Sequence, residues 1–152
     1  MTKPTAVLAA WVACAAVAFG GCSSTESKND YVDKVNEIQQ RANEAYGSAA
    51  NAATNKPGEL IKALNDSEDE LAAVVAELEE LEVPDDAQEG HVDLVAAFDR
   101  LRELVTRAAE SAGKSEGAAV FEPIADLASD GAGVDSKIDQ AINRINQDLG
   151  AE

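Results

Sequence analysis

Beyond residue 30, apolar side chains recur every three or four positions, which is the spacing of one face of an α-helix. Four such stripes follow one another, with Ser67 as the one polar member. They are Tyr31, Val35, Ile38, Ala42, Ala45 and Ala49; Leu60, Leu64, Ser67, Leu71, Val74, Leu78 and Leu81; Leu94, Phe98, Leu101, Val105, Ala108 and Ala112; and Val120, Ile124, Leu127, Gly131, Val134, Ile138, Ala141 and Ile145. No segment keeps the alternation of a strand, so the pattern predicts an all-α protein.

The stripes are separated by short stretches that favour helix ends. Residues 51–58 form one such stretch and carry Pro57, which suits the first turn of a helix. Residues 83–86 hold a second proline, and Gly113 follows the third stripe. Short connections between four helices predict an antiparallel up-and-down four-helix bundle over residues 31–152. We expect the last helix to be broken or kinked near Gly131–Gly133, because each glycine costs about 1 kcal/mol in a helix interior.

The N-terminus has the features of an export signal. Lys3 precedes an uncharged apolar run, Ala6 to Phe19, whose 14 residues are too few to span a bilayer core of about 30 Å. Gly20 and Gly21 supply the small residues that a signal peptidase requires. Residues 1–21 are therefore predicted to be a signal peptide that is removed.

The next residue makes this signal more specific. The stretch Phe19-Gly20-Gly21-Cys22 resembles the lipobox of bacterial lipoproteins, although that motif prefers Leu at the position of Phe19. The resemblance implies that Cys22 becomes the new N-terminus and carries diacylglycerol and further acyl chains such as palmitate. Stable anchoring needs at least two chains, which this modification supplies. Cys22 is also the single cysteine left after cleavage, and acylation explains it; a plain secreted protein with an incidental cysteine is the alternative.

These features place the chain on the extracytoplasmic face of the cell membrane, held by its lipid. Residues 22–30 are expected to be the lipidated cysteine and a polar tether, ahead of an acidic helical domain at 31–152. Overall the chain resembles the small helical lipoproteins of high-GC actinobacteria in its signal region and in its content of alanine and acidic residues. That resemblance implies no functional residue other than Cys22.

Charge limits the possible partners. The formal net charge is −17, and removal of Lys3 with the signal peptide makes it −18. Such a surface repels nucleic acid and anionic lipid headgroups, so a partner attracted by charge would be a cationic protein or peptide, or a metal ion. The simpler alternative is that the charge only keeps the protein soluble.

The single histidine lies among carboxylates. His91, Glu89 and Asp86 are weak candidates for a divalent metal site, because imidazole and carboxylate oxygens are competent ligands but one histidine gives little selectivity. The favoured interpretation is a partly buried histidine that packs over the connection between helices and changes charge near pH 6.5. Asp85 with Gln88, or Asp86 with Glu89, also has the spacing of a capping box.

A second acidic group, Glu77, Glu79 and Glu82, flanks Leu78 on the second helix. These side chains fan outward from one helix, so they do not face one another across a cleft as hydrolytic carboxylates do. They form the candidate partner-binding surface.

Two short motifs suggest catalysis but lack the required context. Residues 108–115 satisfy a loose phosphate-loop pattern, and residues 113–117 match the nucleophile-elbow pattern, yet both motifs need a preceding strand. We therefore predict no enzymatic activity and no cofactor. The predicted function is a tethered, non-enzymatic interaction module of the cell envelope; the alternative is a binding lipoprotein for an apolar small molecule or a divalent metal ion.

Overall fold

A computed structural model describes residues 22–52 and 56–150, with side chains from residue 26 onward; the predicted signal peptide lies outside this range. The described residues form four α-helices and two short 3-10 helices, and no strand. These are α1 (Cys22–Asn51), α2 (Pro57–Glu79), η2 (Asp85–Ala87), α3 (Gln88–Lys114), η3 (Gly117–Phe121) and α4 (Glu122–Leu149). The predicted all-α four-helix bundle is confirmed.

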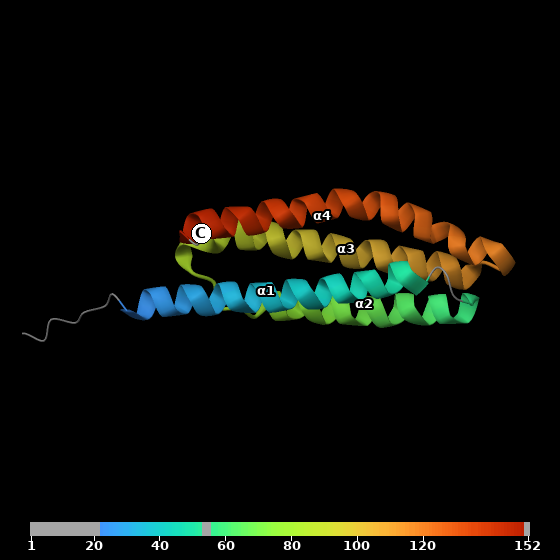
Figure 1. Cartoon of the computed structure of the whole chain (residues 1–152), viewed down its shortest axis with the longest axis horizontal. Helices are drawn as coiled ribbons and strands as arrows, with labels where there is room; N and C mark the ends of the chain where they lie inside the picture. Colours follow the sequence, from blue (N-terminus) through green and yellow to red (C-terminus); the bar gives the residue numbers. More distant parts are fainter. Residues whose placement is uncertain (1–21, 53–55, 151–152) are drawn as a thin grey trace, which may run out of the picture.

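The helices run alternately up and down in two layers (Figure 1). α1 and α2 form one layer, and α3 and α4 form the other. α3 packs along both α2 and α4, whereas α1 packs along α2 and meets α4 at few positions. The start of α1, the α2–α3 connection and the end of α4 all lie at one end of the bundle, and η3 lies at the other.

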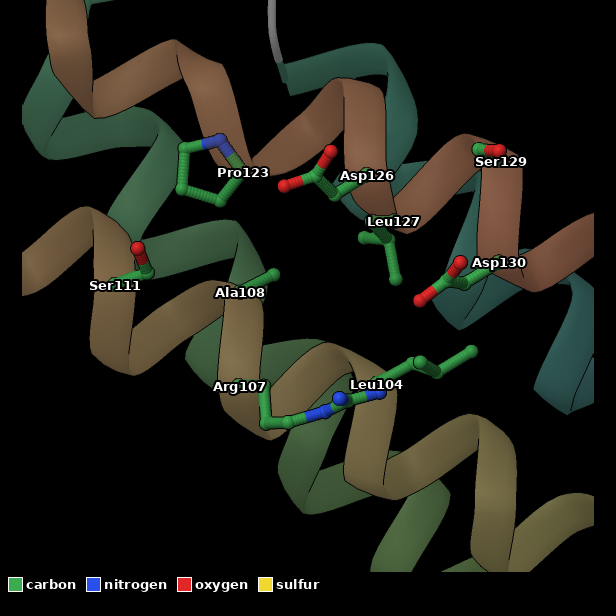
Figure 2. Close-up of a pocket in the computed structure, with 9 residues that line it drawn as sticks. All are labelled: Leu104, Arg107, Ala108, Ser111, Pro123, Asp126, Leu127, Ser129 and Asp130. Carbon is green, nitrogen blue, oxygen red and sulfur yellow. The ribbon is translucent and has the colours of Figure 1, made fainter.

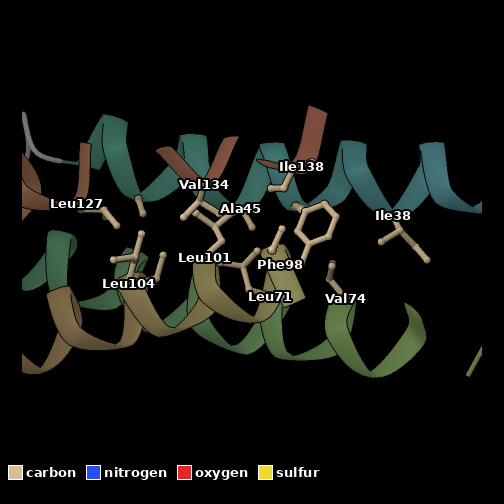
Figure 3. Packing of buried hydrophobic residues seen from close by; sticks show 14 of the residues in the cluster. Ile38, Ala45, Leu71, Val74, Phe98, Leu101, Leu104, Leu127, Val134 and Ile138 are labelled. Carbon is tan, nitrogen blue, oxygen red and sulfur yellow. The ribbon is translucent and has the colours of Figure 1, made fainter. Parts of the chain in front are cut away.

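The core is mainly aliphatic, and most of it comes from the predicted stripes. Side chains from all four helices point into a common interior, with Phe98 as its largest fully buried member (Figure 3). Leu81 and Ile124, which were also placed on the stripes, are only half-buried. Leu104 and Ala97 on α3 are buried although they lie off the predicted stripe, because α3 has a neighbouring helix on two sides.

Ser67 is the one polar side chain on a stripe, and its hydroxyl lies within hydrogen-bonding distance of two carbonyl oxygens. Its Oγ is 2.6 Å from the carbonyl of Ala45 on α1 and 2.7 Å from that of Ala63 on its own helix. A buried hydroxyl is tolerated when it is hydrogen-bonded. This small residue therefore lets α1 and α2 approach closely without leaving a polar atom unsatisfied.

The connection before α3 differs from the prediction. Pro57 does occupy the first turn of α2, as expected. The capping box at Asp85 or Asp86 is wrong, because α3 begins at Gln88 with no side-chain cap and η2 precedes it. Gln88 instead donates from Nε2 to the carbonyl of Val83 at 3.0 Å, which fastens the loop to the start of α3.

α4 continues through Gly131 and Gly133, so it is not broken there; the ribbon of this helix is curved along its length in Figure 1. The Tyr46 hydroxyl of α1 donates to the carbonyl of Leu127 at 3.2 Å. That carbonyl is also the normal i−4 acceptor for the amide of Gly131. A side chain that bonds into a helix ladder is one recognised cause of helix bending.

The predicted polar tether at residues 22–30 is helical, because α1 already begins at Cys22. Residues 23–30 contain neither glycine nor proline, and extending an existing helix is far easier than starting one. Nine helical residues span about 13 Å, less than half of their extended length. In Figure 1 this part of α1 projects beyond the ends of the other helices.

Candidate functional site

Cys22, the predicted lipidation site, is the first residue of α1. About one and a half turns later, Lys28 reaches back to the α2–α3 connection and pairs with Asp86, with its Nζ 2.6 Å from Oδ2. The next contact along α1 is Tyr31, at the edge of the core. The helix that starts at Cys22 is thus fixed to the bundle within its first three turns.

Tyr31 meets His91 in a buried polar contact at this end of the bundle. The Tyr31 hydroxyl lies 3.0 Å from His91 Nδ1, and the two ring centroids are 5.9 Å apart at 58°. The ring of His91 also hydrogen-bonds to the backbone of Leu78. The contact therefore joins α1, α2 and α3 at the level where the projecting part of α1 enters the bundle.

Burial decides the charge of this histidine. Only 7% of His91 is exposed, and desolvation lowers its pKa below the usual 6.5, although the Leu78 backbone bond partly opposes the shift. The expected change of charge near pH 6.5 is therefore wrong, and the ring is neutral at pH 7. A neutral ring that donates from Nε2 to the Leu78 carbonyl leaves Nδ1 to accept from the Tyr31 hydroxyl. Burial likewise raises the pKa of Tyr31 to about 12.

The three metal-ligand candidates do not share one site. Asp86 is exposed and paired with Lys28, and Glu89 lies 3.8 Å from the Arg144 guanidinium. Nδ1 of the buried His91 faces Tyr31. Within residues 22–52 and 56–150, no three histidine, cysteine or acidic side chains lie close enough together to hold a metal ion.

The acidic surface on α2 is divided by an ion pair. The Glu77 carboxylate lies 2.6 Å from Arg41, whose guanidinium also contacts Glu70 at 3.0 Å, so Glu77 helps to join α1 and α2. Both hydrogen bonds raise the pKa of Arg41. Glu79 and Glu82 are exposed and have no ion-pair partner in the described part of the chain. Two of the three predicted residues thus remain available to a partner, together with their neighbour Glu80.

A groove of about 390 Å³ lies between α3 and α4 at the end of the bundle opposite Cys22 (Figure 2). Arg107 and Ser111 come from α3, and Asp126 and Asp130 come from α4. The apolar part of the lining consists of Leu104, Ala108, Pro123 and Leu127, all of them buried. This groove was missed in the sequence, because its two walls are about 20 residues apart and neither carries a motif.

A second groove, of about 440 Å³, lies between the other halves of the same two helices. Its cations are Arg100, Lys137 and Arg144, of which Arg144 bonds to Asp93 at 2.9 Å and Arg100 to Glu103 at 2.7 Å. Most of its charge is therefore already used to hold α3 to α4 and to stabilise α3 itself.

The two segments that match catalytic motifs lie at the end of α3 and just after it. Residues 108–114 belong to α3, so they form a helix and no phosphate-binding loop. Ser115 follows the helix, and its Oγ donates to the carbonyl of Ser111 at 2.9 Å.

No known protein family matches the chain, and neither a curated protein nor a solved structure is detectably similar to it. Across the helices of the described ranges, none has the length and apolar character that crossing a membrane requires.

Proposed function

We propose that the protein is a lipoprotein of the cell envelope, held on the extracytoplasmic face of the cell membrane by a lipid on Cys22. It acts as a non-enzymatic interaction module that recruits a cationic protein or peptide. The lipobox-like sequence supports the anchor, and the position of Cys22 at the projecting end of α1 is compatible with it.

The observation that carries the recruiting role is the exposed acidic surface at the end of α2. Glu79, Glu80 and Glu82 are all exposed, without an ion-pair partner among the residues described, and lie at the same end of the bundle as Cys22. Like charges held together attract a cationic patch and speed its association. A partner close to the membrane would meet this surface first.

The test starts with the lipidated protein as bait in its own envelope. A single stoichiometric cationic partner is the expected result, and its binding should weaken steeply between about 50 and 500 mM salt, since exposed charges are screened over about a Debye length. A co-purifying apolar molecule or metal ion in place of a protein would favour the alternative role as a binding lipoprotein.

A charge-reversal variant tests whether the acidic surface binds the partner. It should keep Glu77, because Glu77 pairs with Arg41 and the loss of this ion pair would weaken the α1–α2 contact. Glu79→Lys with Glu82→Lys should slow association of the captured partner. The matched control is Glu59→Lys with Asp69→Lys, an equal change of charge at exposed positions of α2 that lie away from Glu79 and Glu82. Salt-insensitive binding that survives the reversal of Glu79 and Glu82 would refute the proposed role of this surface.

A further inference from the structure

The groove in Figure 2 holds opposite charges that do not pair with each other. Arg107 extends from α3, while Asp126 and Asp130 project from α4 on the other side. No guanidinium nitrogen of Arg107 lies within 4.0 Å of a carboxylate in the described ranges. The other four arginines of those ranges, Arg41, Arg100, Arg102 and Arg144, each do.

The negative charges on the α4 side of the groove are also not balanced by a neighbouring cation among the described residues. Asp126 and Asp130 are one turn apart on α4, and like charges at this spacing repel by a few tenths of a kcal/mol. Neither has an ion-pair partner among the residues that the structure describes. An ammonium group between them would relieve this repulsion.

The opposite side suits an anion. A guanidinium binds a carboxylate through two parallel hydrogen bonds, and the Ser111 hydroxyl lies one turn further along α3. Between the two sides, Leu104, Ala108 and Leu127 provide a small apolar floor. The volume of about 390 Å³ falls within the usual range for small-molecule sites.

We propose that this groove binds a small zwitterion, such as a free amino acid with a short aliphatic side chain. Its carboxylate pairs with Arg107, its ammonium group lies between Asp126 and Asp130, and its side chain rests on the apolar floor. The site lies at the end of the bundle away from Cys22, so it does not depend on the proposed recruitment through α2.

The test uses the 152-residue chain in detergent micelles and L-alanine as the probe, with binding followed by saturation-transfer difference NMR. Two analogues each lack one charge: L-alaninamide has no carboxylate, and N-acetyl-L-alanine has no ammonium group. L-Alanine should give a saturable signal, and each analogue should bind at least about tenfold more weakly, the factor that corresponds to one interaction of about 1.4 kcal/mol. Equal binding of L-alanine and L-alaninamide would overturn the proposal.

Variants assign the signal to this groove. Arg107→Gln should weaken L-alanine at least about tenfold and leave L-alaninamide unchanged, whereas Asp126→Asn with Asp130→Asn should weaken both. Arg100→Gln is the matched control, because Arg100 is also exposed on α3 but lines the other groove. Circular dichroism checks that each variant is folded. L-Alanine binding that is absent in the wild type, or that survives Arg107→Gln, refutes the site.

Discussion

Tyr46 on α1 lies directly against Gly131 on α4, where the two helices meet. The tyrosine hydroxyl donates to the carbonyl of Leu127 at 3.2 Å, and a methyl group on Gly131 would overlap that hydroxyl. Alanine at this position would require the Tyr46 hydroxyl, the end of a half-buried side chain, to move away from the carbonyl of Leu127. Burial and the nearby Asp135 both raise the pKa of Tyr46, so its hydroxyl stays protonated and able to donate.

We therefore expect Gly131→Ala to destabilise the bundle. Overpacking costs about 1–3 kcal/mol, and the better helix propensity of alanine returns at most about 1 kcal/mol. The matched control is Gly133→Ala, two residues along the same helix, where an added methyl group meets open space and should raise stability by about 0.5–1 kcal/mol. Urea unfolding followed by circular dichroism measures both, and a stabilised Gly131→Ala variant would contradict the observed packing.

Truncation of buried leucines in the core should lower the stability of the protein. Leu78→Ala and Leu101→Ala should each lower the free energy of unfolding by about 2–5 kcal/mol, since both side chains are buried and leave cavities. Leu81→Ala should cost clearly less, because Leu81 is only half-buried. A loss below about 0.5 kcal/mol for Leu101→Ala would be incompatible with its buried position.

His91 predicts how stability depends on pH. Its pKa is lower in the folded protein than in the unfolded chain, so the unfolded chain binds the extra proton first as the pH falls below about 6.5. The contribution of His91 to stability is therefore complete above pH 6.5 and declines below it, by at most about 1.4 kcal/mol per pH unit. Unfolding curves of the wild type and of His91→Gln, measured from pH 7.5 to about 4.5, isolate this contribution from that of the carboxylates. Parallel stability profiles for the two proteins would show that His91 is not shielded from protonation.

Substitution of Cys22 tests the proposed lipid anchor. Cys22→Ala should leave an uncleaved, unlipidated precursor, because the predicted modification and cleavage both require the thiol. Mass spectrometry of the mature wild-type protein should find a diacylglyceryl cysteine at its N-terminus. An unmodified terminus at any other residue would exclude the lipoprotein assignment.

The sequence predicted the core well, because the periodicity of a stripe directly reflects which face of a helix is buried. It did not predict Leu104, whose burial depends on α3 having two neighbouring helices. Helical periodicity gives the direction of one buried face, but the number of neighbouring helices is a property of the whole bundle.

The site was less predictable, because its contacts join residues far apart in the sequence. The sequence does not reveal that Glu77 pairs with Arg41, 36 positions away. The spacing around Asp86 predicts a helix cap, but Asp86 pairs with Lys28, 58 positions away. The periodicity predicts that Tyr31 lies on a core stripe, but it gives no sign that the hydroxyl contacts His91, 60 positions away. Local spacing carries no information about such pairs.

The unbroken path of α1 from Cys22 into the core has a mechanical consequence. A loose tether transmits tension but no torque, whereas a helix transmits both. With a lipid anchor on Cys22, a force at the membrane would therefore be transmitted to the bundle through the rigid first turns of α1. Tilting of these turns would strain the contacts of Lys28 with Asp86 and of Tyr31 with His91 before the rest of the core.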